Sequence, residues 1–382
     1  MNKILNMTVG QTEIHPIIKA SINDSIPVPS YFKEYKEIQA DMLENAKIII
    51  GTKNPIYLRL GTGRVGLETG LYNVVDENTR VLTIDNGQWG HFGGALAENM
   101  GAKVDFLVGK PGQDIDYPKL KEMLSKNKYD ILTMVQNETQ TGALYNPEKV
   151  KKVINEVSKN TLLFVDGISC FGGSDIKFDK WGIDVYVTGS QKCLNAPQGC
   201  PLVCYSQRAI DRMNKIKSNK KFYFSMALEN SPEFLFARAL NDVFTYMLDE
   251  GLENIYNRHT KAAKAVRKGL IALNLKYMAD EEIASPSTTR IVFPSELQKQ
   301  INEDREKYGI DGDRVTVMMK DKYGVCIAED RVGTMGFYTR KSDVLATIIA
   351  LSKTLTELGY KNDIEKAKKA VEDVYKGGHN EL

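Results

Sequence analysis

The chain has 382 residues, of which 42% are hydrophobic, so it can bury a sizeable core and form two domains. Its 51 basic and 49 acidic side chains nearly cancel, which leaves no electrostatic footprint for nucleic acid or an anionic membrane. No apolar run is long enough to cross a bilayer, and residues 1–16 lack the apolar stretch and cleavage site of a signal peptide. We therefore expect a cytoplasmic protein that binds neither nucleic acid nor membrane.

The cysteines and histidines give no metal pattern. None of the five cysteines forms a CxxC pair, and the four histidines are scattered. Buried thiols in a reducing compartment explain the cysteines better than disulfides do. The cysteines are Cys170, Cys193, Cys200, Cys204 and Cys326.

The first part of the chain predicts an extended segment and a short helix over residues 7–22, then a proline-forced turn and an amphipathic helix over 31–47. From there strands and helices alternate, which predicts a parallel sheet covered by helices on both faces. The expected strands are 56–60, 81–84, 104–108, 131–135, 162–165 and 185–187. The expected helices between them are one that begins at about residue 63 and three that span 87–100, 117–125 and 147–157.

The second part of the chain predicts a smaller α+β domain. A long helix over 232–257 is expected to lead out of the sheet domain. The expected elements beyond it are helices near 259–273 and 341–358 and strands near 290–293 and 325–327. We predict a large domain over residues 21–257 and a small domain formed by residues 1–20 and 258–382.

Two ionisable side chains follow neighbouring apolar strands. Asp166 comes directly after the strand over 162–165, and Lys192 follows the strand over 185–187. In a doubly wound α/β sheet the ligand crevice lies outside the carboxyl ends of the strands, so the two should face one another across a small molecule. Lysine forms imines, and pyridoxal phosphate also needs a carboxylate that keeps its ring nitrogen protonated. Taken singly, either residue reads as an ordinary turn or loop residue.

The glycines Gly61, Gly63 and Gly66 spell GxGxxG between a strand and a helix, and Asp85 lies near the ribose-binding position of a dinucleotide fold. A nicotinamide-dependent dehydrogenase is therefore an alternative, although it leaves the acid and lysine pair without a role. Backbone amides at a helix N-terminus make an anion site whichever cofactor carries the phosphate.

Two further stretches place polar or aromatic groups at strand ends. Residues 86–90 form a glycine turn that presents Trp89, whose ring can stack on a flat heterocycle or belong to the core. Residues 138–142 follow the strand over 131–135 and include Thr139 and Gln140. Their hydroxyl and amide groups can bind a phenolic oxygen or cap the next helix.

These stretches together resemble the class V aminotransferases, which are fold-type I pyridoxal-phosphate enzymes, and most of all the alanine–glyoxylate and serine–pyruvate aminotransferase group. The similarity runs from Met7 to about Gly359. Its most specific part, VDGIS…DKWGIDVYVTGSQKCLNAPQG within residues 165–199, combines a strand-end aspartate, a W-G-x-D stretch and S-Q-K before a proline-glycine turn. The resemblance implies an α/β fold with a large, mostly parallel-sheet domain and a smaller α+β domain.

The resemblance also implies a role for each matching residue. Lys192 corresponds to the Schiff-base lysine, which later carries the substrate's α proton, and Asp166 to the partner of the pyridine nitrogen. Arg331 corresponds to an arginine that grips the substrate carboxylate bidentately. The other implied contacts are Gly63, Arg64 and Gln191 at the phosphate, Trp89 on the ring, Thr139 and Gln140 near the phenolic oxygen, Ser231 at the neighbouring subunit's phosphate, and Gly10 at the substrate.

Some positions depart from the family pattern. Gln140 stands where serine is usual, and residues 222–232 differ from the tyrosine-to-threonine-proline stretch that reaches the neighbouring subunit. These departures bear on substrate choice and on contacts between subunits. Because family members are usually dimers with the active site at the subunit boundary, the resemblance implies a homodimer.

The sequence therefore predicts a pyridoxal-phosphate-dependent aminotransferase that moves an amino group from a small amino acid, such as alanine or serine, to a small 2-oxo acid, such as glyoxylate or pyruvate. A lyase or desulfurase with the same cofactor is an alternative. Cysteine desulfurases, however, have a histidine in place of Gln191 and need a mobile nucleophilic cysteine, whereas Cys193 directly follows the lysine. The dehydrogenase is the less favoured alternative.

Overall fold

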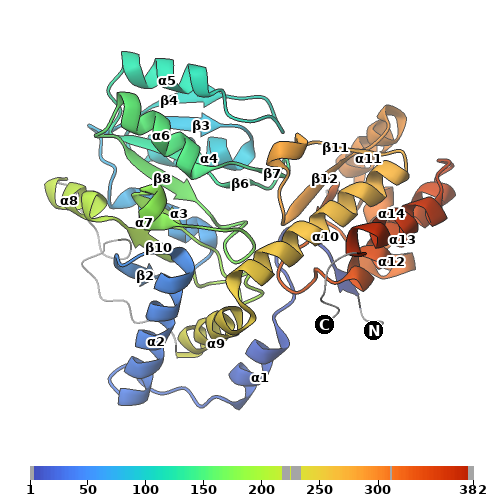
Figure 1. Cartoon of the computed structure of the whole chain (residues 1–382), viewed down its shortest axis with the longest axis horizontal. Helices are drawn as coiled ribbons and strands as arrows, with labels where there is room; N and C mark the ends of the chain where they lie inside the picture. The colour runs from blue at the N-terminus through green and yellow to red at the C-terminus, as the bar shows by residue number, and fades with distance from the viewer. Residues whose placement is uncertain (1–3, 217–223, 225–233, 310–311, 377–382) are drawn as a thin grey trace.

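The computed structural model describes residues 4–216, 224, 234–309 and 312–376 of the chain. Figure 1 shows a layered sheet with helices on the left and a second group of helices around short strands on the right, with α10 (Leu252–Ala272) running between the two. This arrangement agrees with the predicted α/β fold and its smaller α+β part.

The central sheet has seven strands within the described residues, in the order β2, β10, β9, β8, β5, β3, β4. Strand β10 is antiparallel to both of its neighbours, whereas β9, β8, β5, β3 and β4 pair in parallel, so the predicted mostly parallel sheet is confirmed. The strands are β2 (Ile56–Leu58), β3 (Arg80–Asp85), β4 (Lys103–Val108), β5 (Ile131–Val135), β8 (Leu162–Asp166), β9 (Val185–Val187) and β10 (Leu202–Tyr205).

Both faces of this sheet are buried. On β8, Leu163 and Val165 belong to one apolar cluster and Leu162 and Phe164 to another, because successive side chains of a strand point to opposite faces. Helices α2, α5 and α6 contribute to the first cluster, and α3 and α8 to the second. The helices around the sheet are α2 (Lys33–Ile50), α3 (Gly63–Tyr72), α4 (Gln88–Asn99), α5 (Tyr117–Lys126), α6 (Pro147–Val157), α7 (Phe178–Trp181) and α8 (Gln207–Lys215).

The prediction of one helix over 232–257 is wrong. Residues 232 and 233 lie outside the described residues, and the rest is divided between α9 (Phe234–Glu250) and α10. Gly251 separates them with a φ of 84°, a left-handed conformation that an α-helix cannot continue. Helix α10 then runs unbroken past residue 257, so it contributes Ile255 to the first sheet cluster and Ala262 to a separate cluster further on.

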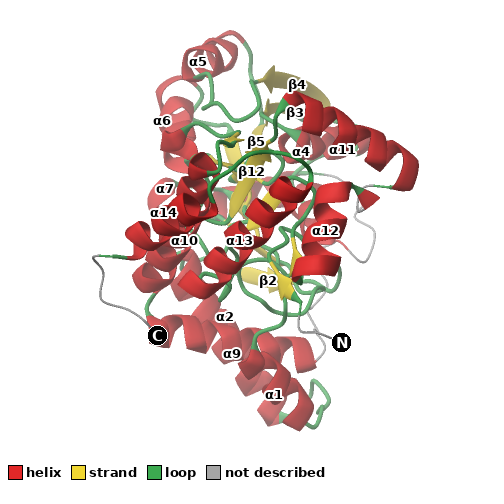
Figure 2. Cartoon of the chain, turned by 90° about the vertical axis from the view of Figure 1, so that its right-hand side faces the viewer, coloured by secondary structure: helices red, strands yellow, loops and turns green. Residues whose placement is uncertain are grey.

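The smaller part of the molecule holds that separate cluster. Its three-stranded antiparallel sheet has the order β11, β12, β14, and α13 packs against both α12 and α14, as Figure 2 shows. The sequence analysis did not foresee α11, α12 or α14. The elements are β11 (Lys276–Tyr277), η2 (Glu281–Ile283), β12 (Thr288–Val292), α11 (Ser295–Tyr308), α12 (Arg314–Tyr323), β13 (Val325–Cys326), β14 (Arg331–Gly333), α13 (Lys341–Glu357) and α14 (Ile364–Tyr375).

The N-terminal segment joins the two parts. Strand β1 (Leu5–Asn6) pairs in parallel with β13, and α1 (Pro16–Asp24) packs against α9. The short hairpin of β6 (Asn137–Glu138) and β7 (Ala143–Leu144) lies beyond the carboxyl end of β5. Residues between β1 and α1 therefore pass the carboxyl edge of the large sheet, where the candidate site lies.

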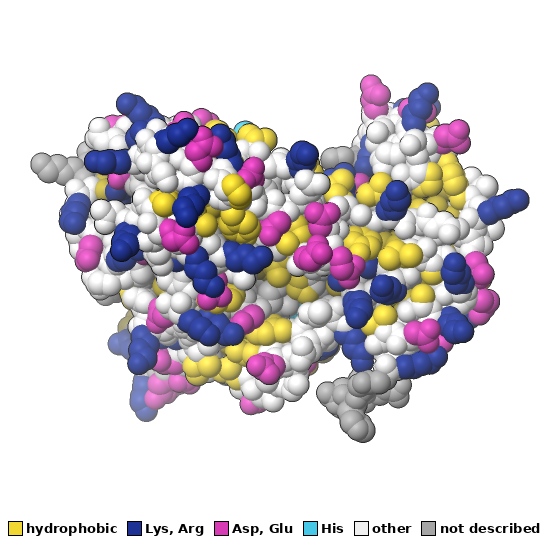
Figure 3. All heavy atoms as spheres, turned by 45° about the horizontal axis from the view of Figure 1, so that its top comes forward, with side chains coloured by type: hydrophobic (Ala, Val, Ile, Leu, Met, Phe, Trp, Pro, Cys, Tyr) yellow, Lys and Arg dark blue, Asp and Glu magenta, His cyan; other side chains and the backbone are white. Residues whose placement is uncertain are grey.

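The surface mixes both signs of charge. On the face drawn in Figure 3, basic and acidic side chains are interspersed with apolar ones. Among the described residues, none of the helices combines the length and the apolarity that crossing a bilayer requires. The same residues contain no group of three or more side chains arranged to hold a metal ion.

Candidate active site

Asp166 and Lys192 meet at the carboxyl edge of the sheet. Asp166 is the last residue of β8 and pairs in register with Val187, the last residue of β9, after which the chain continues to Lys192. The lysine lowers the pKa of the aspartate, and the aspartate raises the pKa of the lysine. This mutual effect places the two charged groups within electrostatic reach of one another.

Asp166 is a buried acid, and few hydrogen bonds or positive charges offset the cost of burying its carboxylate. Burial raises the pKa of its carboxyl to about 7, against the effect of a 2.9 Å hydrogen bond from the amide of Ile168. The nearby carboxylate of Glu138 raises this pKa further. Such a group is stabilised by a cation placed against it, and a protonated ring nitrogen is a cation of this kind.

The pKa of Lys192 is shifted in the opposite direction, downward. Burial lowers the pKa of its amine to about 8, and the guanidinium of Arg331 lowers it as well. The Nζ atom donates a hydrogen bond to the carbonyl oxygen of Val9, in the N-terminal segment. A lowered pKa increases the fraction of free amine, which is the form that attacks a carbonyl group.

The glycine loop lies against the same site. A Cβ on Gly63 would come within 2.8 Å of Ile168, and a Cβ on Gly189 within 2.7 Å, so both loops close around that side chain. Thr62 makes no side-chain hydrogen bond to the first turn of α3. The first amides of an α-helix lack intrahelical partners, so this end of α3 is suited to an anion close to Asp166.

Arg64 and Trp89 are brought together at this end of α3. The guanidinium carbon of Arg64 lies 5.7 Å from the centroid of the Trp89 ring and 5.9 Å from that of Phe92, which is cation–π geometry. The cation and the aromatic ring expected to contact the cofactor therefore lie side by side.

Glu138 belongs to the site, and the sequence analysis missed it. Its carboxylate is fully buried and accepts hydrogen bonds from the amides of Trp89 at 2.8 Å, Gly90 at 3.1 Å and Gln140 at 2.9 Å. It therefore caps the start of α4, and burial raises its pKa. The sequence did contain an indication of this role, because Glu138 is a carboxylate just beyond the buried strand over 131–135. The prediction used only the hydroxyl and amide groups of the residues that follow it.

Thr139 and Gln140 differ in their contacts. The hydroxyl of Thr139 donates to Oγ of Ser169 at 2.7 Å, so it reaches the segment that follows Asp166. The side-chain amide of Gln140 instead donates to Gln88 at 2.6 Å. Thr139 therefore faces the acid end of the site, while the Gln140 side chain is engaged at the start of α4.

The loop that carries Lys192 is tied to the N-terminal segment. The carbonyl oxygen of Gln191 accepts hydrogen bonds from the amide and the hydroxyl of Thr12, at 3.1 and 3.0 Å. A Cβ on Gly10 would meet no atom within 4 Å, so open space adjoins the backbone there. Ser231 lies outside the described residues.

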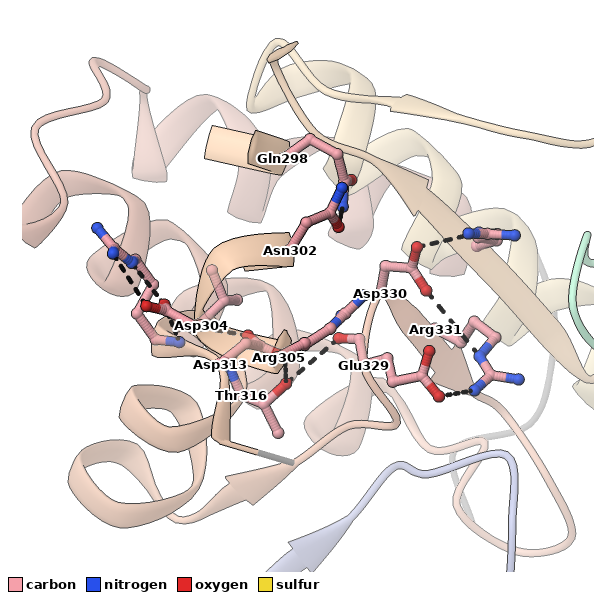
Figure 4. Close-up of polar contacts among 12 residues, drawn as sticks. Gln298, Asn302, Asp304, Arg305, Asp313, Thr316, Glu329, Asp330 and Arg331 are labelled. Carbon is pink, nitrogen blue, oxygen red and sulfur yellow. Dashed lines mark hydrogen bonds and ion pairs between the residues drawn. The ribbon is translucent and has the colours of Figure 1, made fainter. Parts of the chain in front are cut away.

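Arg331 reaches the site from the smaller part of the molecule. It is the first residue of β14, only 7% of its surface is exposed, and its charge lowers the pKa of Lys192. Figure 4 shows its guanidinium between two carboxylates: Nη2 donates to Glu329 at 2.6 Å, and Nε lies 4.0 Å from Asp330. Within the described residues its buried Nε has no hydrogen-bond partner.

The strand order argues against the dehydrogenase. The GxGxxG loop follows β2 at one edge of the sheet, whereas Asp85 ends β3, and β10, β9, β8 and β5 lie between the two. A dinucleotide-binding fold needs the loop and the ribose-binding acid at the ends of adjacent strands. Asp85 is instead paired with His91 at 2.9 Å.

The surroundings of Cys193 argue against a desulfurase. Its side chain is buried, and burial raises the pKa of the thiol to about 12. It packs with Val9 and Met335 in a small apolar cluster. A desulfurase needs an accessible thiolate, which this environment disfavours.

The residues at this edge fit pyridoxal phosphate. Asp166 suits a protonated ring nitrogen, Lys192 suits an aldehyde, and the uncapped end of α3 suits a phosphate. Ile168 packs against both glycine loops, so the start of α3 and the segment that leads to Lys192 both lie close to the residues that follow Asp166.

Comparison with known proteins agrees with this assignment. Residues 29–311 match the family model described as aminotransferase class-V. The (S)-ureidoglycine–glyoxylate transaminase of Bacillus subtilis is 27% identical, over 97% of this chain and 94% of the relative, and the alanine–glyoxylate aminotransferase of Rattus norvegicus is 27% identical over 69% and 67%. The crystal structure of ureidoglycine–glyoxylate aminotransferase from Bacillus subtilis superposes with a TM-score of 0.89 at 26% identity, covering 99% of both chains.

The matched region contains the whole carboxyl edge of the large sheet, including the acid, the lysine and the glycine loop. The solved relative extends the likeness to the smaller part that carries Arg331. The chain therefore belongs to the class-V aminotransferase family and is a pyridoxal-phosphate-dependent aminotransferase.

Proposed function

We propose that this enzyme moves an amino group from a small amino acid, such as alanine or serine, to a small 2-oxo acid, such as glyoxylate or pyruvate. The observation that carries the proposal is that Asp166 and Arg331 both act on the pKa of Lys192: the guanidinium lowers it and the carboxylate raises it, so an acid and a guanidinium both lie near one buried amine of lowered pKa. Relatives that act on glyoxylate with ureidoglycine, alanine or aspartate support the choice of acceptor.

In this proposal the cofactor supplies an aldehyde and a ring that accepts electrons from the substrate's Cα–H bond. Lys192 would hold the cofactor covalently until the substrate amine replaces it, and the released amine would then take and return the α proton at Nζ, for which its lowered pKa is suited. The carboxylate of Asp166 keeps a positive charge on the ring nitrogen, because that charge relieves its own burial.

The other cofactor contacts are assigned by residue type and position. The first turn of α3, with Gly63 and Arg64, would hold the phosphate together with Gln191. Trp89 would cover the ring, and Thr139 would reach the phenolic oxygen. Gln140 and Ser231 complete the set, at the phenolic oxygen and at the neighbouring subunit's phosphate respectively.

Arg331 and Gly10 are proposed to bind the substrate. A guanidinium grips a carboxylate through two parallel hydrogen bonds, which fixes the bond at Cα that will break. The open space at Gly10 gives the rest of a small substrate room beside the Val9 carbonyl.

We further propose a cytoplasmic homodimer with each active site at the subunit boundary. The cysteines are free, and all but Cys326 are buried, which suits a reducing compartment. We place the large domain at residues 21–257 and the small domain at residues 1–20 and 258–382. The change of apolar cluster along α10, between Ile255 and Ala262, supports a division near residue 257.

The test is spectroscopic and kinetic. Purified protein incubated with pyridoxal phosphate should absorb visible light, and a panel of amino acids should identify those that bleach this band and leave a protein able to aminate glyoxylate or pyruvate. Lys192→Ala should lose the band, whereas Lys110→Ala, at an exposed lysine, should keep it. Colourless wild-type protein, or a Lys192→Ala variant with unchanged absorbance, would refute the proposal.

A further inference from the structure

The carboxylate of Glu329 occupies the proposed substrate-binding arginine. Its Oε1 atom lies 2.6 Å from Nη2 of Arg331. Each of the two edges through which a guanidinium grips a carboxylate bidentately includes Nη2. A substrate carboxylate arriving at Arg331 therefore meets a carboxylate that already holds part of this site.

The backbone at Glu329 adopts a conformation that its residue type disfavours. Ala328 and Arg331 exchange two backbone hydrogen bonds, of 3.0 and 2.9 Å, so Glu329 and Asp330 form a two-residue hairpin turn. Glu329 has a φ of 60°, in the region where such turns prefer glycine or asparagine. Residues in disfavoured backbone conformations are concentrated at functional sites, so a functional role for Glu329 would explain why the turn has a glutamate there.

The backbone of the turn at Glu329 and Asp330 packs against the first turn of α12. The carbonyl oxygen of Glu329 lies 3.4 Å from the hydroxyl of Thr316, which is itself 2.9 Å from the buried carboxylate of Asp313 (Figure 4). Asp313 caps α12 and also accepts a hydrogen bond from Arg305 at 3.2 Å. The single hydroxyl proton of Thr316 goes to Asp313 in the shorter contact, so the backbone of Glu329 packs beside this buried network. The side chain of Glu329 lies between Arg331 and solvent.

The neighbouring acid, Asp330, contacts a different arginine through one oxygen, while its other oxygen, Oδ1, lies 4.0 Å from Nε of Arg331. Asp330 is 2% exposed and accepts a 3.0 Å hydrogen bond from Arg290, whose Nη1 donates to the carbonyl oxygen of Gln140 at 2.8 Å. It is therefore engaged with the strand alongside. The side chain of Glu329 is 23% exposed and that of Arg331 is 9% exposed, so the glutamate is the more able of the two to move into solvent.

We propose that Glu329 is a positioning residue that occupies Arg331 in the substrate-free enzyme and leaves when a substrate carboxylate enters. The inference rests on the proposed function, in which Arg331 binds that carboxylate. In this state Glu329 lies against the guanidinium, and a substrate carboxylate that uses the same N–H group of Nη2 must displace it. Glu329 thereby sets the affinity for amino acids and 2-oxo acids alike, because both carry a carboxylate.

The test compares three variants of the cofactor-loaded enzyme. Glu329→Gln removes the charge and keeps the side-chain length. Glu329→Gly removes the charge and suits the positive φ, so this variant should fold at least as well as the wild type. Glu303→Gln is the matched control, because Glu303 is an exposed glutamate on α11 that pairs with Lys299 at 3.9 Å.

The probe is propionate, an unreactive carboxylate, with propionamide as its neutral counterpart. We expect the inhibition constant of propionate to fall about fivefold to tenfold in both Glu329 variants. Propionamide inhibition and the Glu303→Gln variant should be unchanged. The KM values of the amino acid and the 2-oxo acid should fall together, whereas a merely structural disturbance would raise them or lower kcat.

Unchanged or weaker propionate binding in both Glu329 variants would overturn the inference. Failure of the proposed function looks different: the wild type would then show no visible band with pyridoxal phosphate and no amino transfer. A wild type that is coloured and active, beside Glu329 variants that bind propionate as the wild type does, would therefore refute the role of Glu329 alone.

Discussion

Nζ of Lys151 lies 2.9 Å from Oδ2 of Asp184, and both side chains are buried, at 7% and 2% exposure. Asp184 also accepts hydrogen bonds from the amide of Leu163 at 2.9 Å and the hydroxyl of Ser206 at 2.8 Å. It precedes β9 and binds the backbone of β8, so this pair holds together the two strands that deliver Asp166 and Lys192.

Loss of Asp184 should destabilise the enzyme more than loss of Lys151. We expect Asp184→Ala to lower the unfolding free energy by about 3–5 kcal/mol, because it strands a buried lysine. Lys151→Met should cost less, about 1–3 kcal/mol, since Asp184 keeps its other donors. Urea denaturation measures both, and a larger loss in Lys151→Met would contradict the argument.

Glu138 should position Trp89. We expect Glu138→Ala to cost about 1–3 kcal/mol, because it leaves the first amides of α4 without an acceptor. Glu138→Gln keeps an oxygen and should cost less. Thermal unfolding gives the stability, and fluorescence in a Trp181→Phe background reports on Trp89. Unchanged fluorescence in Glu138→Ala would show that the carboxylate does not position the ring.

The raised pKa of Asp166 should make cofactor-free protein sensitive to pH. Because the folded pKa of about 7 exceeds the ordinary 3.8, the folded chain binds an extra proton between pH 4 and 7, and stability falls as pH rises through this window. Asp166→Asn removes the cost of burying this charge, so at pH 8 the variant should be about 4 kcal/mol more stable than the wild type. At pH 4 the two should agree. Urea denaturation at both pH values tests this, and equal stability at pH 8 would contradict it.

The lowered pKa of Lys192 should govern cofactor attachment. The free amine forms through a pKa of about 8 instead of the ordinary 10.5, so the attachment rate should rise through pH 8 and level off above about pH 9. Arg331→Gln should move this midpoint upward, because the guanidinium lowers the pKa of the amine. Stopped-flow absorbance of cofactor-free protein measures the rate. A rate still climbing steeply at pH 10 in the wild type would show an unperturbed lysine.

The sequence predicted the centre of the site because the relevant rule is local. Buried strands are recognisable from short apolar runs, and parallel strands end at one edge, so Asp166 and Lys192 could be assigned to that edge from pattern alone. The cap of α12 was equally accessible: Asp313 precedes the helix and accepts from its first amides, but this signal was overlooked.

Other features depend on contacts that no local pattern records. Glu138 caps a helix that begins far back in the chain, at Gln88, so its role appears only once the strands are assembled. The break at Gly251 was missed because apolar spacing continues on both sides of it. The turn at Glu329 and Asp330 places a glutamate at the position of positive φ, where glycine or asparagine is usual, so no turn was expected there.

The pairing of β1 with β13 joins residues 5–6 to residues 325–326, and the amide of Gly333 donates to the carbonyl oxygen of Met7 at 2.7 Å. Translation therefore makes the segment that supplies Val9 to Lys192 long before it makes β13 and β14, to which that segment is bonded. Until β13 and β14 have been made, the Lys192 amine lacks the fixed Val9 carbonyl and the Arg331 guanidinium, so the nascent polypeptide cannot complete this pocket before both strands leave the ribosome.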